Sequence, residues 1–85
     1  MDPEVVKRVI GVIARTQHLE ESKITVDASY EELGIDSLDG VNILFGLENE
    51  FDIQIADDSA KQIRSIRQTV EGVEQLVAQK TARAG

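Results

Sequence analysis

The residues best suited to chemistry lie around one serine, Ser37, which follows Asp36 and precedes Leu38 and Asp39. A serine hydroxyl can act as a nucleophile, can cap a helix, or can be the point to which a group is attached. The surrounding stretch, residues 24–60, contains ten acids and no Lys or Arg. Two interpretations stay open at this point: Ser37 merely caps the helix that follows it, or something is attached to it.

The other residues give little support to a hydrolase or a metal site. The single histidine, His18, is not brought near Ser37 by the sequence, and no Gly-x-Ser-x-Gly motif surrounds the serine. We expect His18 to be exposed at the end of the first helix. The acids around Asp52, Asp57 and Asp58 lack the alternation and the central Gly of an EF-hand loop. We therefore expect no catalytic residue, no metal site and no enzyme activity.

The composition is that of one small domain. Of its 85 residues 41% are hydrophobic and 29% are charged, which is ordinary for a globular protein. The absence of Cys excludes disulfides, thiolate metal sites and thiol chemistry from the chain itself. A net charge of −7 repels nucleic acid and attracts basic protein surfaces. With no membrane span and no signal-peptide pattern, we expect a cytoplasmic protein. We also expect it to be a monomer.

The hydrophobic pattern predicts an all-α fold of three main helices and a short third one. Asp2 as N-cap and Pro3 at the first helical position start a helix that runs to about residue 17. A long loop, residues 18–36, follows, with a turn into a short helical segment through Glu32. Its apolar side chains should hold it to the core: Leu19, Ile24, Val26, Tyr30, Leu33 and Ile35.

The second half of the chain carries the remaining helices. The second helix begins at Asp36 or Ser37 and runs to about Phe51, and a short segment covers Asp57 to Ile63. The last helix starts with Ser65 as N-cap and Gln68 three residues later, a capping-box pattern, and frays by about Lys80. Its buried stripe is Ile66, Val70, Val73, Leu76 and Val77. The domain thus covers residues 1–80, and residues 81–85 are expected to be a disordered tail.

The second helix has two apolar faces. On a helical projection, one face carries Ile43, Leu44, Leu47 and Phe51, with Gly40 between them, and should face the core. The opposite face carries Leu38, Val41 and Phe45, flanked by Asp39, Glu48 and Asp52, and predicts an exposed stripe that binds another protein. The alternative is a helix enclosed on all sides. Gly40 should allow close helix packing, whereas the pattern gives no reason for Gly46.

Residues 32–55, ELGIDSLDGVNILFGLENEFDIQI, resemble the 4′-phosphopantetheine attachment segment of acyl carrier proteins, with its L-G-x-D-S-L core. The match holds at Leu33-Gly34, Asp36-Ser37-Leu38-Asp39, Leu47-Glu48 and Glu50-Phe51 in register, and the resemblance extends over residues 3 to about 80. It implies a freestanding carrier with an acyl-carrier-like bundle. It also implies that a phosphopantetheinyl transferase esterifies Ser37 from coenzyme A. The arm's thiol would then carry an acyl group as a thioester.

The resemblance also assigns residues to binding. Asp36 and Leu38 flank the attachment site, and Asp36 and Asp39 should help the transferase to dock. Leu38, Val41, Phe45 and Glu48 fall where the family's recognition helix meets basic patches of acyl-transferring and condensing enzymes. The residues that resemble those around a sequestered acyl chain are Ile43, Leu47, Phe51, Ile53, Ile55, Ile63 and Ile66.

Several residues depart from the pattern of fatty-acid carriers. Gly40 and Asn42 stand where Thr or Ser and Glu are usual, and Lys61, Arg64 and Arg67 make the region after the short helix more basic. These departures favour a specialised lipid or polyketide pathway over housekeeping fatty-acid synthesis. Two alternatives remain: an unmodified helical interaction module and a carrier of amino acids for peptide synthesis. The cargo and the cognate enzymes are not identified by the sequence.

Overall fold

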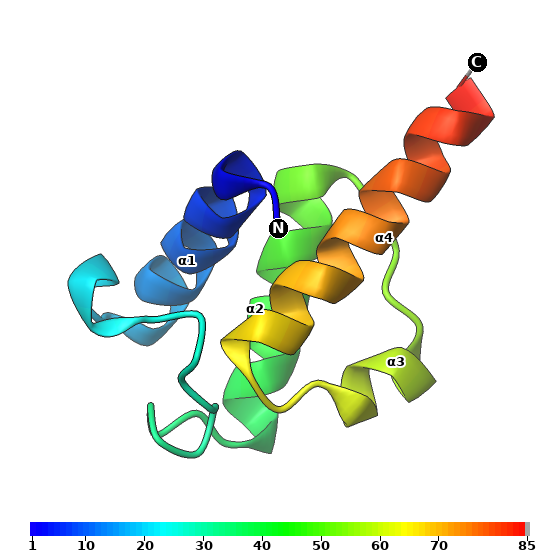
Figure 1. Cartoon of the computed structure of the whole chain (residues 1–85). Coiled ribbons are helices and arrows are strands. Elements are labelled where there is room, and N and C mark those ends of the chain that lie inside the picture. Colours follow the sequence, from blue (N-terminus) through cyan, green and yellow to red (C-terminus); the bar gives the residue numbers. More distant parts are fainter. Residues whose placement is uncertain (85) are drawn as a thin grey trace.

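The computed structural model describes the backbone of residues 1–84 and the side chains of residues 1–80. Over this range the elements are α1 (Pro3–Gln17), the 3₁₀ turn η1 (Glu21–Lys23), α2 (Ser37–Phe51), α3 (Asp57–Gln62) and α4 (Ile66–Ala84). α1 packs against both α2 and α4, while the short α3 lies at the side of this three-helix bundle (Figure 1). The predicted all-α fold is therefore confirmed. No helix in residues 1–84 is long and apolar enough to cross a membrane.

The first helix begins and ends as its sequence predicts. The Asp2 carboxylate caps α1 by accepting a hydrogen bond from the N–H of Glu4 at 2.9 Å, and Pro3 occupies the first turn. The helix ends at His18, an exposed residue with a left-handed backbone at φ 56°, whose N–H donates to the carbonyl of Ala14. Both ends are fixed by local hydrogen bonds, which explains why the sequence alone located them.

The start of α4 confirms the predicted cap but not its full pattern. The Ser65 hydroxyl accepts a hydrogen bond from the N–H of Gln68 at 3.1 Å, as an N-cap should. The Gln68 side chain, however, accepts from the N–H of Arg64 at 2.7 Å, one residue before the cap. These two hydrogen bonds of Gln68 together span residues 64–68 and hold the junction between α3 and α4.

The long loop between α1 and α2 supplies the remaining acceptors at the start of α4. The N–H of Ile66 donates to the Ala28 carbonyl, and the N–H of Arg67 donates to the Val26 carbonyl, both at 3.1 Å. These are N–H groups that an α-helix leaves without an internal partner. The loop is thus fastened to α4 by backbone bonds between segments about 40 residues apart in the chain.

Tyr30 adds a side-chain anchor to the same junction. The Thr69 hydroxyl donates its only hydrogen to the Ser65 carbonyl at 2.8 Å, so the Tyr30 hydroxyl must donate to Thr69 Oγ1, at 2.5 Å. Burial raises the pKa of the Tyr30 phenol. The neutral, donating phenol is therefore the form that holds the loop.

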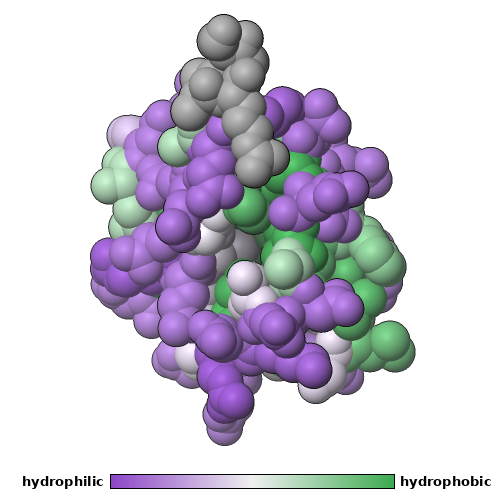
Figure 2. All heavy atoms as spheres, turned by 90° about the vertical axis from the view of Figure 1, so that its right-hand side faces the viewer, coloured by the Kyte–Doolittle hydropathy of each residue, from purple (hydrophilic) through white to green (hydrophobic). Residues whose placement is uncertain are grey.

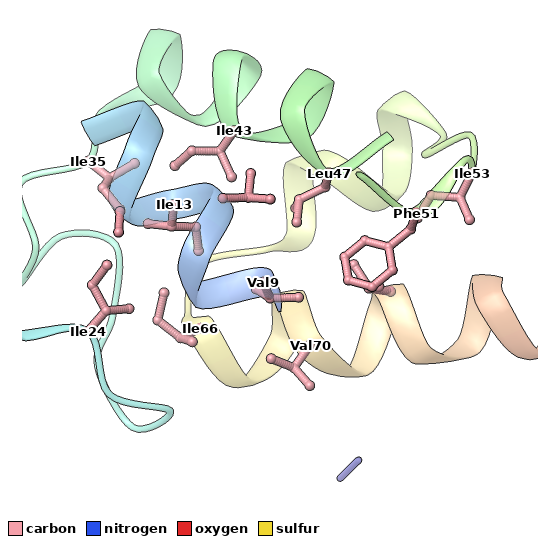
Figure 3. Close-up of a cluster of buried hydrophobic side chains, with 13 residues drawn as sticks. Val9, Ile13, Ile24, Ile35, Ile43, Leu47, Phe51, Ile53, Ile66 and Val70 are labelled. Carbon is pink, nitrogen blue, oxygen red and sulfur yellow. The ribbon is translucent and has the colours of Figure 1, made fainter. Parts of the chain in front are cut away.

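One loop prediction was wrong. A short helical segment was expected to follow the turn at residues 26–29 and run through Glu32, but there the structure has only a hydrogen-bonded turn, held by reciprocal bonds between Ser29 and Glu32. The helical turn of the loop lies earlier, at η1. Ile24 and Ile35 are buried as expected, and they point into the core beside α1 (Figure 3).

The core combines the predicted faces of the three long helices. Val9 and Ile13 of α1, Ile43 and Leu47 of α2, and Val70 of α4 point toward one another (Figure 3). The α4 stripe is also confirmed, since Ile66, Val70 and Val73 are buried and Leu76 and Val77 pack against them. α3 contributes no buried residue, so it is not part of the core.

Two further expectations are corrected. A Cβ on Gly46 would lie 2.8 Å from Cγ1 of Val12 in α1, whereas a Cβ on Gly40 would meet nothing within 4 Å. Gly46, and not Gly40, is therefore the glycine that allows close helix packing. The last helix continues to Ala84 and not only to about Lys80, consistent with the strong helix propensities of its final Ala, Gln, Lys and Arg residues. Gly85, at the end of the expected tail, lies outside the described residues.

Candidate functional site

Ser37 is the first residue of α2, and its side chain is exposed. The residue that caps this helix is Asp36, whose carboxylate accepts a hydrogen bond from the N–H of Asp39 at 2.8 Å. In return the Asp39 carboxylate accepts from the N–H of Asp36 at 3.3 Å. The interpretation that Ser37 merely caps the helix is therefore wrong, because a capping box made by the two aspartates already does so.

The capping box leaves the Ser37 hydroxyl free for another use. Within the part of the chain that the structure describes, this hydroxyl makes no hydrogen bond to the protein. It sits at the N-terminal end of α2, where backbone N–H groups and the helix dipole favour a negatively charged group. Asp36 and Asp39 hold the backbone on both sides of it, so its position is fixed although its side chain faces solvent.

An open groove of about 820 Å³ lies beside Ser37, between the start of α2, the long loop and α3. Its walls combine apolar side chains with charged ones at the rim. The apolar residues are Ile35, Val41, Leu44, Ala60 and Ile63. The charged residues are Glu31, Asp36, Lys61 and Arg64. A flexible chain attached at Ser37 could therefore lie against apolar surface without leaving the groove.

The outer face of α2 carries the predicted apolar stripe. Leu38 is 72% exposed, Phe45 59% and Val41 44%, while Ile43 and Leu47 of the opposite face are fully buried. On the face that Figure 2 shows, hydrophobic surface extends from the centre to the right-hand edge among hydrophilic residues. The alternative of a helix enclosed on all sides is wrong. Three large apolar side chains in contact with water mark a surface that another protein can cover.

Glu48, which was expected to dock partners, also has a structural bond. Its carboxylate accepts a hydrogen bond from the backbone N–H of Ile55 at 2.8 Å, and the side chain is half-buried. This bond holds the segment after α2 against the helix. The local sequence could not reveal it, because the partner is a backbone group seven residues away.

The acidic stretch is less uniformly anionic than its sequence suggests. Bases from outside residues 24–60 fold back onto it: Arg67 pairs with Asp27 at 2.6 Å and Lys80 with Asp52 at 2.9 Å. Hydrogen bonding to Lys80, followed by the attraction of its charge, lowers the pKa of Asp52. The acids that remain without an ion pair in residues 1–80 include Asp36, which caps α2, and Asp39 and Glu48 on α2.

Glu50 is held by two arginines of α1. Its carboxylate lies 2.9 Å from Arg8 Nε and 3.6 Å from an Arg15 nitrogen. The hydrogen bond from Arg8 is the main cause of the lowered Glu50 pKa, with further contributions from both positive charges. Arg8 also lies over the Phe51 ring, 4.3 Å from its centroid. This end of α2 is therefore bound to α1 and does not belong to the exposed surface near Ser37.

Among the side chains of residues 1–80, no group of three or more His, Cys, Asp or Glu residues is placed to hold a metal ion. His18 caps α1 and takes part in no such cluster. The chemistry near Ser37 is that of an exposed hydroxyl beside a groove.

The family model that matches the chain describes a phosphopantetheine attachment site, and the match covers residues 7–73. The chain is 41% identical over 80 residues to "Acyl carrier protein 5, chloroplastic" of Arabidopsis thaliana, covering 93% of this chain and 58% of that relative. It thus spans less than two thirds of the relative's length. The acyl carrier protein of Guillardia theta is 36% identical over 78 residues, covering 91% of this chain and 96% of that one.

A solved structure supports the same fold. The crystal structure of an acyl carrier protein from Thermotoga maritima superimposes with a TM-score of 0.80 at 18% sequence identity, covering 89% of each chain. At this identity the likeness concerns the arrangement of the helices alone. It confirms the acyl-carrier-like bundle expected from the sequence.

Proposed function

This chain belongs to the family of acyl carrier proteins with a phosphopantetheine attachment site, and on that premise we propose that Ser37 bears a 4′-phosphopantetheine arm. The observation that carries the proposal is that the Ser37 hydroxyl does not cap α2. Asp36 and Asp39 cap α2 between them, and the serine lies exposed at its first position. A transferase can reach such a hydroxyl without unfolding the helix.

The composition and the surroundings of Ser37 fit this arm. The chain contains no Cys, so a thiol has to come from a bound group. When bound, the arm supplies that thiol, which carries an acyl group as a thioester. The start of α2 favours the negative charge of the phosphodiester, and the groove beside it offers apolar walls to an alkyl chain.

We propose that the domain delivers acyl groups and does not itself catalyse their reactions. The carboxylates nearest to Ser37 in sequence, those of Asp36 and Asp39, accept backbone hydrogen bonds in the capping box, and neither is hydrogen-bonded to the Ser37 hydroxyl in the described residues. Activation would therefore come from the phosphopantetheinyl transferase. The same role requires acyl-transferring and condensing enzymes as further partners, with basic surfaces that suit a protein of net charge −7.

The docking surface that we propose for these enzymes is the outer face of α2. It joins the exposed apolar stripe of Leu38, Val41 and Phe45 to the carboxylates of Asp39 and Glu48. Apolar contact would supply affinity, while the acids would orient a basic partner. The domain would serve fatty-acid, polyketide or specialised lipid synthesis, and the basic residues Lys61, Arg64 and Arg67, at and after the end of α3, favour the specialised pathways. The monomeric state and the cytoplasmic location stay predictions.

The direct test is attachment of the arm. The protein is incubated with coenzyme A, Mg²⁺ and a broad-specificity phosphopantetheinyl transferase, and its intact mass is measured. We expect a gain of one phosphopantetheine in the wild type and in Ser22→Ala, which alters another exposed serine on η1. We expect no gain in Ser37→Ala. A wild type that no transferase modifies, or a gain that persists in Ser37→Ala, would refute the assignment.

A further inference from the structure

Two basic residues, Lys61 and Arg64, line the groove beside Ser37. We propose that their side chains bind an anionic group carried by the tethered arm, either its own phosphodiester or a carboxylate on its acyl cargo. The proposal rests on the proposed function, because it requires an arm on Ser37. It adds a binding site for a charge to a groove whose other walls are largely apolar.

Lys61 and Arg64 are two of the four bases of residues 1–80 that make no ion pair in this range; the others are Lys7 and Lys23. Among the bases of residues 1–80, the side chains of Arg8, Arg15, Arg67 and Lys80 each pair with a carboxylate of the domain. Lys61 and Arg64 make no ion pair in this part of the chain, although Glu31 and Asp36 line the same groove. Of the four unpaired bases, Lys61 and Arg64 are the two that line the groove together with Ser37.

The backbone at Arg64 is held in place independently of its side chain. Its N–H donates to the Gln68 side chain at 2.7 Å, and its carbonyl accepts from the N–H of Tyr30 at 2.9 Å. Lys61 lies one turn earlier, near the end of α3. The backbone that carries Arg64 is therefore fixed relative to the long loop and to α4, while both side chains are exposed to solvent. A fixed backbone loses less freedom when the side chain binds an anion than a mobile loop would.

Attachment of the arm to Ser37 explains how two exposed cations can be enough to bind its anionic group. A free anion in solution gains little from exposed basic residues, because water screens the interaction. A group attached at Ser37 is confined to the neighbourhood of the groove, at an effective concentration of the order of mM. The weak attraction of each cation then acts on a ligand that cannot diffuse away. Arg64 can also hold a carboxylate or phosphate oxygen pair through two parallel hydrogen bonds.

The test compares three loaded forms of the protein. A broad-specificity transferase attaches the arm from coenzyme A, butyryl-coenzyme A or succinyl-coenzyme A, and the intact mass confirms each product. The butyryl and succinyl groups have the same number of carbons and differ chiefly in the terminal carboxylate. Each form is prepared in the wild type, in Lys61→Gln/Arg64→Gln and in Lys7→Gln/Lys23→Gln. The last variant removes two other exposed bases that make no ion pair in residues 1–80, neither of which lines this groove.

The readouts separate the two possible sources of the anion. If the cargo carboxylate is bound, the amide resonances of residues 60–64 differ between the succinyl and butyryl forms of the wild type. That difference disappears in Lys61→Gln/Arg64→Gln and persists in Lys7→Gln/Lys23→Gln. If the phosphodiester is bound, its phosphorus resonance in the unacylated form shifts in Lys61→Gln/Arg64→Gln only, and the two acyl forms give the same amide resonances.

The proposal is overturned if Lys61→Gln/Arg64→Gln changes neither comparison, or if both double variants change them equally. The second result would mean that net charge alone is responsible. Failure of the wild type to gain any mass would instead refute the attachment of the arm, so the two hypotheses fail in different ways.

Discussion

The Glu48 carboxylate accepts a hydrogen bond from the backbone N–H of Ile55 at 2.8 Å. Glu48 therefore fastens the segment between α2 and α3 to the helix. It also contributes negative charge to the proposed docking surface on the outer face of α2. The two roles can be separated, because glutamine keeps an oxygen acceptor without the charge. A lysine at this position would lose both.

Substitutions of Glu48 should separate docking from stability. We expect Glu48→Gln and Glu48→Lys both to slow acyl transfer from the loaded protein to a partner enzyme with a basic surface, and high salt to slow the wild type similarly. Only Glu48→Lys should lower the free energy of unfolding, by about 1 kcal/mol, because it leaves the Ile55 N–H without its acceptor. Acyl-transfer rates at two salt concentrations and urea denaturation provide the measurements. An unchanged transfer rate in Glu48→Gln would show that this charge is not used.

The two helical glycines should respond in opposite directions to alanine. Gly46→Ala places a Cβ 2.8 Å from Cγ1 of Val12, a buried core residue, so one of the two helices must shift. We expect this clash to lower the free energy of unfolding by about 1–3 kcal/mol, outweighing the better helix propensity of alanine. Gly40→Ala meets nothing within 4 Å and should raise stability by about 0.5–1 kcal/mol. Urea denaturation of both variants tests the assignment, and a stabilising Gly46→Ala would contradict it.

Truncation on the two faces of α2 should affect different properties. Phe45→Ala removes an exposed ring, so it should change stability by no more than about 0.5 kcal/mol. It should nevertheless reduce the catalytic efficiency of partner enzymes by about tenfold if the ring is an anchor of the interface. Ile43→Ala, on the buried face, should cost about 2–5 kcal/mol of stability. Enzyme kinetics with the loaded protein decide the point: equal kinetics for Phe45→Ala and wild type would exclude the stripe from docking.

The pairing of Glu50 with Arg8 should make the stability of the fold depend on pH. The lowered Glu50 pKa means that the folded state favours the carboxylate, so its contribution is present above the ordinary value of 4.5 and is lost as the pH falls toward the lowered value. We expect the melting temperature of the wild type to fall more steeply below about pH 4.5 than that of Glu50→Gln. Glu20→Gln, an exposed acid without an ion pair in residues 1–80, is the control. Since Glu50 is solvent-accessible, 1 M salt should reduce the difference.

Much of the fold and of the site could be predicted from local signals. The caps at Asp2 and Ser65 and the exposed stripe of α2 depend on residues within about one turn of each other, and the structure confirms them. On the predicted core face of α2, Ile43, Leu47 and Phe51 are buried, whereas the prediction for Leu44 was wrong, because it is only partly buried and lines the groove beside Ser37. The position of Ser37 at the start of α2 was also predictable, although the sequence left open whether it or Asp36 formed the cap. The reciprocal bonds between Asp36 and Asp39 answer that question.

What the sequence by itself determined is where helices start, which of their faces are apolar, and that a serine stands at the head of α2. These properties follow from hydrogen bonds and side-chain periods that act over a few residues. Only the tertiary structure decided that Gly46 faces α1, that Lys80 neutralises Asp52, and that Lys61 and Arg64 border the groove. Each of these depends on how separate helices pack, and packing brings together residues whose distance along the chain carries no local signal.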